Sequence, residues 1–102
     1  MRVSMTTVRG PDGLGGPARL AAETMRSWLG QFDGYRGTLV LVDEPERTAR
    51  FLTFWESADA EEKSRMGRAR MREQMVAAAG VELEGNEVYS VAFVDGLPLG
   101  RS

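Results

Sequence analysis

Five basic side chains lie close together in the chain and form its densest group of residues with chemical potential. They are Lys63, Arg65, Arg68, Arg70 and Arg72. On a helix, such a run is usually a solvated face that pairs with nearby acids, here Glu61, Glu62 and Glu73. The alternative is a patch that binds phosphate or carboxylate groups. We expect the solvated face.

Catalytic residue types are scarce in the rest of the chain. The 102 residues include no histidine and no cysteine, so the commonest general base, metal ligand and thiol nucleophile are missing. No serine can then be assigned a base, and no pair of acids has a defining spacing. Positions 10–16 are rich in glycine but match neither GxGxxG nor a P-loop, which favours a flexible connection or a lid over a phosphate site. We expect no metal and no cofactor.

Trp55 is the residue best suited to a binding role, because it ends an apolar run just before a helix that contains small residues. Two interpretations stay open. The indole packs in the core, as it most often does in a sheet, or it forms the wall of a pocket. In the second case Ser64, Gly67 and the flexible Met71 would leave room for an apolar ligand between helix and sheet.

A hairpin positions Trp55. Positions 35–43 and 50–56 have the β-branched and aromatic composition of strands, and the polar turn 44–47 between them contains Pro45. A connection this short joins antiparallel neighbours. Both runs are apolar at odd and even positions, so both faces of the sheet need cover.

Alternation along the second strand of the hairpin assigns each side chain to a face. If Trp55 faces the helices, Phe51 and Thr53 face them too, while Leu52 and Phe54 face the other way.

The remaining elements complete the order strand, helix, strand, strand, helix, strand. They are a strand at positions 2–8, a helix from Pro17 to Gly30, a helix from Ser57 or Asp59 to Ala79 with Gly80 as its stop, and a strand at 87–95. The order predicts an α+β, ferredoxin-like βαββαβ fold with a four-stranded antiparallel sheet. We expect a single domain over 1–96 and a short tail over 97–102.

Small and flexible residues form the buried stripe of each helix. The predicted stripes are Ala21, Met25, Trp28 and Leu29 in the first helix, and Ala60, Ser64, Gly67, Met71, Met75 and Ala78 in the second. Both helices then cover the same face. The other face would be apolar in all four strands, with Met5 and Val8 counted for the first strand. Such a surface predicts a homodimer whose sheets lie face to face.

Bulk composition argues against several classes of partner. The chain is 42% hydrophobic and 27% charged, as in an ordinary globular protein, and its net charge of -2 suits neither nucleic acid nor a membrane surface. Positions 50–55 superficially resemble an RNA-binding strand, but the first strand offers no aromatic partner. Without a membrane span or a signal peptide, we expect a cytoplasmic protein.

One sequence resemblance points to a family. The run from Phe51 to Ser57, FLTFWES, precedes Ala58-Asp59-Ala60 at the start of a long helix, and Gly34-Tyr35-Arg36-Gly37 precedes the hairpin. This pattern resembles the antibiotic biosynthesis monooxygenase-like family of dimeric α+β barrels. The resemblance covers the whole chain by element order and is specific around Phe54-Trp55-Glu56-Ser57.

The resemblance implies a function. Several members of that family are cofactor-independent oxygenases of polycyclic aromatic phenols, and a related branch degrades haem. In both, a tryptophan at this strand end lines the pocket, which implies that role for Trp55. The haem branch uses a histidine on the second helix, which this chain lacks, and an asparagine where this chain has Thr6 and Thr7. We therefore do not expect haem degradation.

Two hypotheses follow for the same cavity. The first is a cofactor-free monooxygenase-like enzyme that acts on a small aromatic or polycyclic substrate. The second is a non-catalytic dimer that binds a small ligand or an interaction partner. For the first, the predicted substrate-binding residues are Trp55, Phe51, Met71 and Tyr35, with Arg9 and Tyr89 as further candidates for positioning the substrate.

Overall fold

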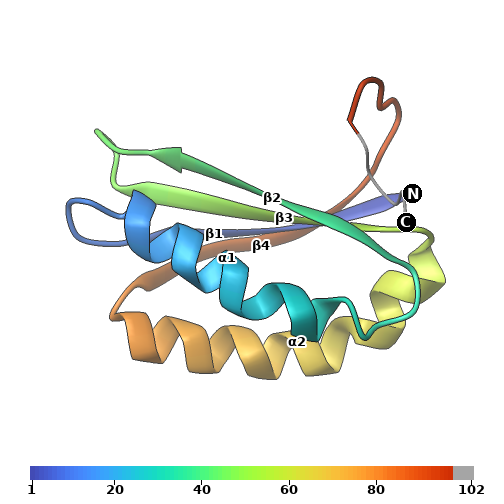
Figure 1. Cartoon of the computed structure of the whole chain (residues 1–102), viewed down its shortest axis with the longest axis horizontal. Coiled ribbons are helices and arrows are strands. Elements are labelled where there is room, and N and C mark those ends of the chain that lie inside the picture. The colour runs from blue at the N-terminus through green and yellow to red at the C-terminus, as the bar shows by residue number, and fades with distance from the viewer. Residues whose placement is uncertain (98–102) are drawn as a thin grey trace.

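The computed structural model describes residues 1–97 and places two helices against one four-stranded sheet (Figure 1). The elements are β1 (Arg2–Arg9), α1 (Gly15–Leu29), β2 (Tyr35–Asp43), β3 (Thr48–Trp55), α2 (Ala58–Ala79) and β4 (Glu82–Ser90). The strand order is β2-β3-β1-β4, and every paired neighbour is antiparallel. Both helices lie on one face. The predicted α+β, ferredoxin-like βαββαβ fold is confirmed.

The glycine-rich segment before α1 is fastened to the hairpin turn. The Gly10 N–H donates to the Arg47 carbonyl and the Gly15 N–H donates to Glu44 Oε1, each at 3.0 Å. Leu14, between them, is buried in the core. We expected a flexible connection or a lid here, and the structure shows these three attachments. The Glu44 carboxylate also takes an N–H at the start of α1 that a phosphate would otherwise use.

A serine and a glycine mark the ends of α2. Ser57 Oγ accepts a hydrogen bond from the Ala60 N–H at 3.1 Å, so Ser57, and not Asp59, is the N-cap. Asp59 pairs instead with Lys63 at 3.0 Å. Gly80 follows the helix with a φ of 66°, a left-handed conformation that glycine adopts without strain.

The sheet-facing stripe of α2 departs from the prediction in its last turn. Its buried or half-buried members are Ala60, Ser64, Gly67, Met71 and Met75, as predicted. Ala78 and Ala79 are both exposed, and of the two it is Ala79 that lines the space beneath the sheet. Positions on one helix face recur after three or four residues, and the step after Met75 is four.

The last strand was predicted about five residues too late. We expected positions 87–95, but β4 ends at Ser90. The length of β1 decides this, because its ladder to β4 runs from Arg9 paired with Glu82 to Arg2 paired with Ser90. The apolar residues that follow lie beyond the sheet, and Phe93 is 83% exposed.

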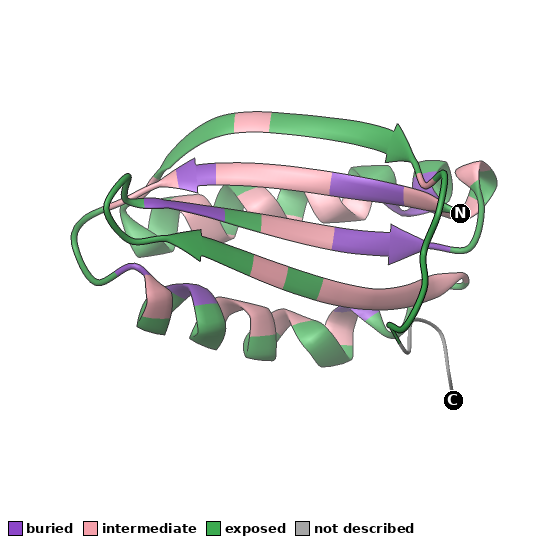
Figure 2. Cartoon of the chain, turned by 90° about the horizontal axis from the view of Figure 1, so that it is seen from above, coloured by how far each residue is buried: buried purple, intermediate pink, exposed green. Residues whose placement is uncertain are grey.

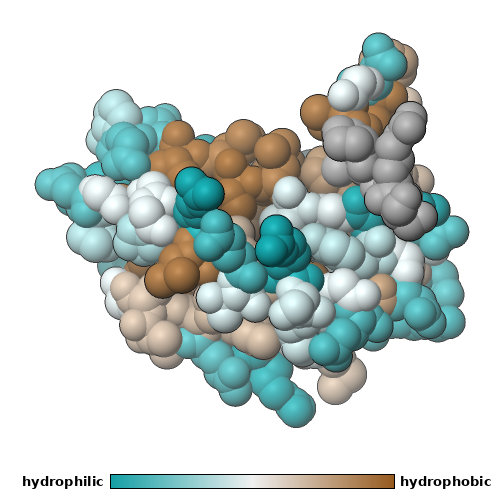
Figure 3. Space-filling view, viewed as in Figure 1, coloured by the Kyte–Doolittle hydropathy of each residue, from teal (hydrophilic) through white to brown (hydrophobic). Residues whose placement is uncertain are grey.

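The face of the sheet opposite the helices is apolar at its centre. Leu52 and Phe54 lie on it, as their alternation with Phe51 and Thr53 predicted, and Leu39 and Leu41 of β2 lie beside them. Brown, hydrophobic atoms gather on this side of the sheet in Figure 3. We call Leu39, Leu41, Leu52 and Phe54 the open face.

Two details of this face were predicted wrongly. Val8 packs against Leu14 and Ala18 on the helix side, and β4 contributes the charged Glu87, which pairs with Met5. The face is therefore not apolar in all four strands. The green edge strands and the purple centre in Figure 2 show that exposure is concentrated at the edges.

The chain beyond β4 rises on the open side of the sheet and crosses the end of the central strands (Figures 1 and 2). Val3 and Phe54, at that end, are buried. Positions 98–102 of the predicted tail lie outside the described residues. Neither α1 nor α2, the helices of residues 1–97, has the length and apolar character needed to cross a bilayer.

Candidate functional site

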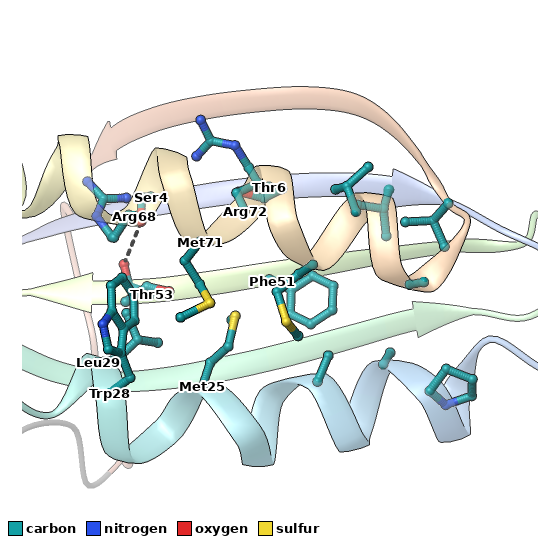
Figure 4. Close-up of a pocket in the computed structure, with 18 of the residues that line it drawn as sticks. Ser4, Thr6, Met25, Trp28, Leu29, Phe51, Thr53, Arg68, Met71 and Arg72 are labelled. Atoms are coloured by element: carbon teal, nitrogen blue, oxygen red, sulfur yellow. Dashed lines mark hydrogen bonds between the residues drawn. The ribbon is translucent and has the colours of Figure 1, made fainter.

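A cavity of about 120 Å³ lies between the two helices and the sheet (Figure 4). The wall from α1 consists of the predicted stripe, Ala21, Met25, Trp28 and Leu29, together with Pro17 and Ala18. Leu14, just before α1, and Val81, just after α2, close one end of the cavity. Met25 and Met71 face each other across the cavity in Figure 4, so flexible thioether side chains set its width.

The sheet provides the floor of the cavity. Phe51 and Val8 supply apolar surface, while Ser4, Thr6 and Thr53 supply hydroxyl groups. A mainly apolar enclosure with a few polar groups is the usual construction of a small-molecule site.

The four predicted binding residues divide into two pairs. Phe51 and Met71 line the cavity, whereas Trp55 and Tyr35 are not among the described residues that line it. Trp55 is fully buried, and the Tyr35 ring packs edge to face against it with 5.9 Å between ring centroids. Trp55 therefore stands behind the cavity wall, and a part for these residues in binding stays a prediction.

Trp55 is held on several sides. Its Nε1–H donates to Ser4 Oγ at 3.3 Å, and the Phe32 ring lies 6.1 Å away, centroid to centroid. We expected free space beside Gly67, but a Cβ built there would lie 3.2 Å from Phe32 Cζ. The small residue on α2 therefore admits the Phe32 ring, and the cavity lies further along the helix.

Arg68 is the clearest departure from the expected solvated basic face. Its side chain is 11% exposed and lies over the Trp55 ring, with Cζ 5.0 Å from the centroid. Its guanidinium donates to Ser64 Oγ at 2.8 Å and to the Glu61 carbonyl at 3.0 Å, and it also binds the Glu61 carboxylate. Arg65 binds the same carboxylate from the solvent side, as the predicted pairing required.

The charges of this cluster stabilise one another. Burial by itself would raise the pKa of Glu61, but the hydrogen bonds and positive charges of Arg65 and Arg68 outweigh it and hold the pKa below its ordinary value. Burial lowers the pKa of the Arg68 guanidinium, and the hydrogen bond and charge of Glu61 offset part of that. A guanidinium with this partner stays charged at neutral pH.

Arg72 lies one turn further along α2 and, unlike Arg68, has an unsatisfied hydrogen-bond donor. It also lines the cavity, but its Nε is buried and has no hydrogen-bond partner within residues 1–97. Sequence reasoning missed the special position of Glu61, Arg68 and Arg72. The signal was their spacing, because positions 61, 64, 68 and 72 follow the buried stripe of the helix at steps of three and four.

The other candidates lie away from the cavity. Arg9 pairs with Glu84 at 3.0 Å and donates to the Glu46 carbonyl at 2.7 Å, near the hairpin turn. Tyr89 is half exposed and pairs with Val3, which places it on the opposite face of the sheet. Residues 1–97 contain no group of three acidic side chains that could hold a metal ion.

Comparison with known proteins gives the fold a name. No protein-family model matches the sequence, and no curated protein matches it. Among solved structures, a proposed antibiotic biosynthesis monooxygenase from Deinococcus radiodurans superposes with a TM-score of 0.69 at 15% identity, covering 95% of this chain and 98% of its own. The fold is that of the antibiotic biosynthesis monooxygenases. The fold expected from the sequence resemblance is thus confirmed.

A second structure with this monooxygenase fold is a substituted variant of MhuD, crystallised with two manganese protoporphyrin IX molecules per active site. It superposes with a TM-score of 0.66 at 19% identity, covering 94% of this chain and 99% of its own. The present sequence contains no histidine that could bind the metal of a porphyrin.

Proposed function

We propose that this protein binds a small aromatic molecule in the cavity between its helices and its sheet and oxygenates it without a cofactor. The cavity itself carries the proposal. Its volume of about 120 Å³ approaches the roughly 150 Å³ of an apolar cavity known to bind benzene. Phe51 and the methionines of both helices provide the apolar walls such a ligand needs.

In this chemistry the substrate itself supplies the electrons. A ring CH₂ group activated as in an anthrone loses a proton to water and becomes a delocalised carbanion. The carbanion transfers an electron to O₂, and the two radicals combine into a peroxide, which takes up a proton. Loss of water then leaves a carbonyl group. One oxygen atom enters the product and the other leaves as water, so no external reductant is required.

The residues of the chain have a limited part in these steps. The apolar walls hold the ring and exclude water, and the guanidinium groups of Arg68 and Arg72 provide positive charge beside the developing anion. No other charged side chain of the described residues lines the cavity.

Oxygen consumption with anthrone, whose additional rings would extend from the cavity into its opening, tests the proposal. We expect uptake above the uncatalysed rate, with one O₂ consumed for each carbonyl formed. Ala21→Leu would fill the cavity and should abolish the uptake, whereas Ala77→Leu, on the exposed side of α2, should leave it unchanged. Uptake equal to the uncatalysed rate in the wild-type protein would refute the oxygenase.

The second candidate is a non-catalytic binding protein that uses the same cavity. The observation in its favour is that no carboxylate of the described residues lines the cavity, so no acid–base pair is available there. Saturable binding of aromatic ligands in the absence of any product would support this candidate against the first.

We also propose that two copies associate through the open face. Leu39 and Leu41 are 39% and 48% exposed there, and apolar surfaces of this kind mark interaction sites. The exposed Phe93, in the segment that rises on the same side, adds to the surface available to a second copy.

A further inference from the structure

We infer that the cavity takes a single-ring ligand bearing a negatively charged oxygen group, and that Arg72 binds this group. The inference rests on the proposed binding function and specifies its ligand. It concerns a carboxylate or an ionised hydroxyl, since both present the same charged oxygen to a guanidinium.

The first support is the unsatisfied donor on Arg72. Its Nε is buried without a hydrogen-bond partner within residues 1–97. A guanidinium remains charged at every physiological pH and carries five N–H donors, so burying one of them unpaired is unfavourable. After a small movement of the flexible Arg72 side chain, an oxygen anion in the cavity would supply the missing acceptor.

The second support is the balance of charge along α2. The Glu61 carboxylate binds both Arg65 and Arg68, so its single negative charge is shared between two positively charged guanidinium groups. Arg72 has no acidic partner in the described part of the chain. This wall of the cavity therefore carries excess positive charge, and burial strengthens its attraction for an anion.

The third support is geometric. Figure 4 shows Arg72 leaving α2 beside Thr6 and extending over β1, while Met25 and Phe51 lie further toward α1. The Thr6 hydroxyl already donates to Asn86 Oδ1 at 3.1 Å, so its proton is not available to a ligand. A ring held by Met25 and Phe51 would reach Arg72 through a substituent that extends past Thr6, since Thr6 and Arg72 both line the cavity.

The volume of the cavity limits the size of the ligand. About 120 Å³ is close to the space that one benzene ring needs, so any additional ring would have to extend into the opening. The best-fitting ligand is consequently a monocyclic acid or phenolate.

Benzoate and benzamide test the inference because they share shape and differ in charge. Titrations at pH 7 would follow the indole N–H signal of Trp28, which lines the cavity, by NMR. We expect benzoate to bind wild-type protein at least tenfold more tightly than benzamide. Arg72→Gln should reduce that ratio to about one, and Arg72→Lys should keep part of it.

Arg70→Gln is the matched control, since Arg70 is exposed on the same helix and its loss changes the net charge equally. It should leave the benzoate-to-benzamide ratio within twofold of wild type. A wild-type ratio near one, or a ratio that Arg72→Gln leaves unchanged, would overturn the inference but not the cavity. Failure of benzoate, benzamide and toluene alike to bind would overturn the binding function as well.

Discussion

The Arg68 guanidinium lies 5.0 Å from the centre of the Trp55 ring and joins that buried ring to the Glu61 carboxylate. Arg68 also lines the cavity, whereas Trp55 stands behind it. Trp55 can influence a ligand through Arg68, through Ser4, which accepts the indole N–H, or through Phe32, whose ring also packs against Trp28. The tryptophan positions the wall of the cavity and does not form it.

Loss of Arg68 should destabilise the fold. Arg68→Gln removes one partner of a buried carboxylate, and we expect a loss of about 3 kcal/mol in the free energy of unfolding, at the low end for a broken buried pair because Arg65 remains. Urea denaturation measures the change. Arg70→Gln should cost less than about 0.5 kcal/mol, and an equal loss in both variants would contradict a structural role for the cluster.

Glu61 should make stability depend on pH in the acid range. Its pKa is lower in the folded protein than the ordinary 4.5, so its ionised form stabilises the fold above that pH. The contribution is lost as the pH falls from about 4.5 through the lower pKa of the folded protein. Melting temperatures between pH 7 and pH 2 should show this loss in the wild type and a smaller one in Glu61→Gln. Parallel pH curves would disprove the assignment.

The two tryptophans should report differently on a bound ligand. In Trp55→Phe the remaining Trp28 lines the cavity, so an aromatic ligand should change its emission strongly. In Trp28→Phe the remaining Trp55 is fully buried behind the wall, and the change should be several times smaller. Fluorescence titration of both variants checks this. A larger change in the emission of Trp55 than of Trp28 would show that the ligand does not bind in the cavity.

Association through the open face can be tested with one substitution. Leu41→Glu places a charge on that face and should shift a dimer to monomer in sedimentation velocity at micromolar concentration. Leu20→Glu is the control, because Leu20 is also exposed but belongs to α1. A wild-type monomer under these conditions, or dissociation by both variants, would argue against the proposed interface.

Local patterns were sufficient to predict most of the architecture. Apolar runs at 35–43 and around Trp55, the turn at Pro45 and the stop at Gly80 each act on a few neighbouring residues, and all lie where they were expected. The stripe on α1 also predicted one wall of the cavity, since helical periodicity depends on sequence spacing alone. The predicted bounds of β4 were wrong because a strand ends where its partner β1 ends, whatever the apolar character of the residues that follow.

The sequence alone therefore determined the fold, the alternation of faces along β3 and the apolar nature of the space beneath the sheet, because these follow from periodicity and from the stiffness of particular residues. Only the tertiary structure decided which charges enter that space. Arg68 and Arg72 belong to the same basic run as the exposed Arg70. Burial and the distance to Glu61 separate them, and both depend on how α2 packs against β1 and β3.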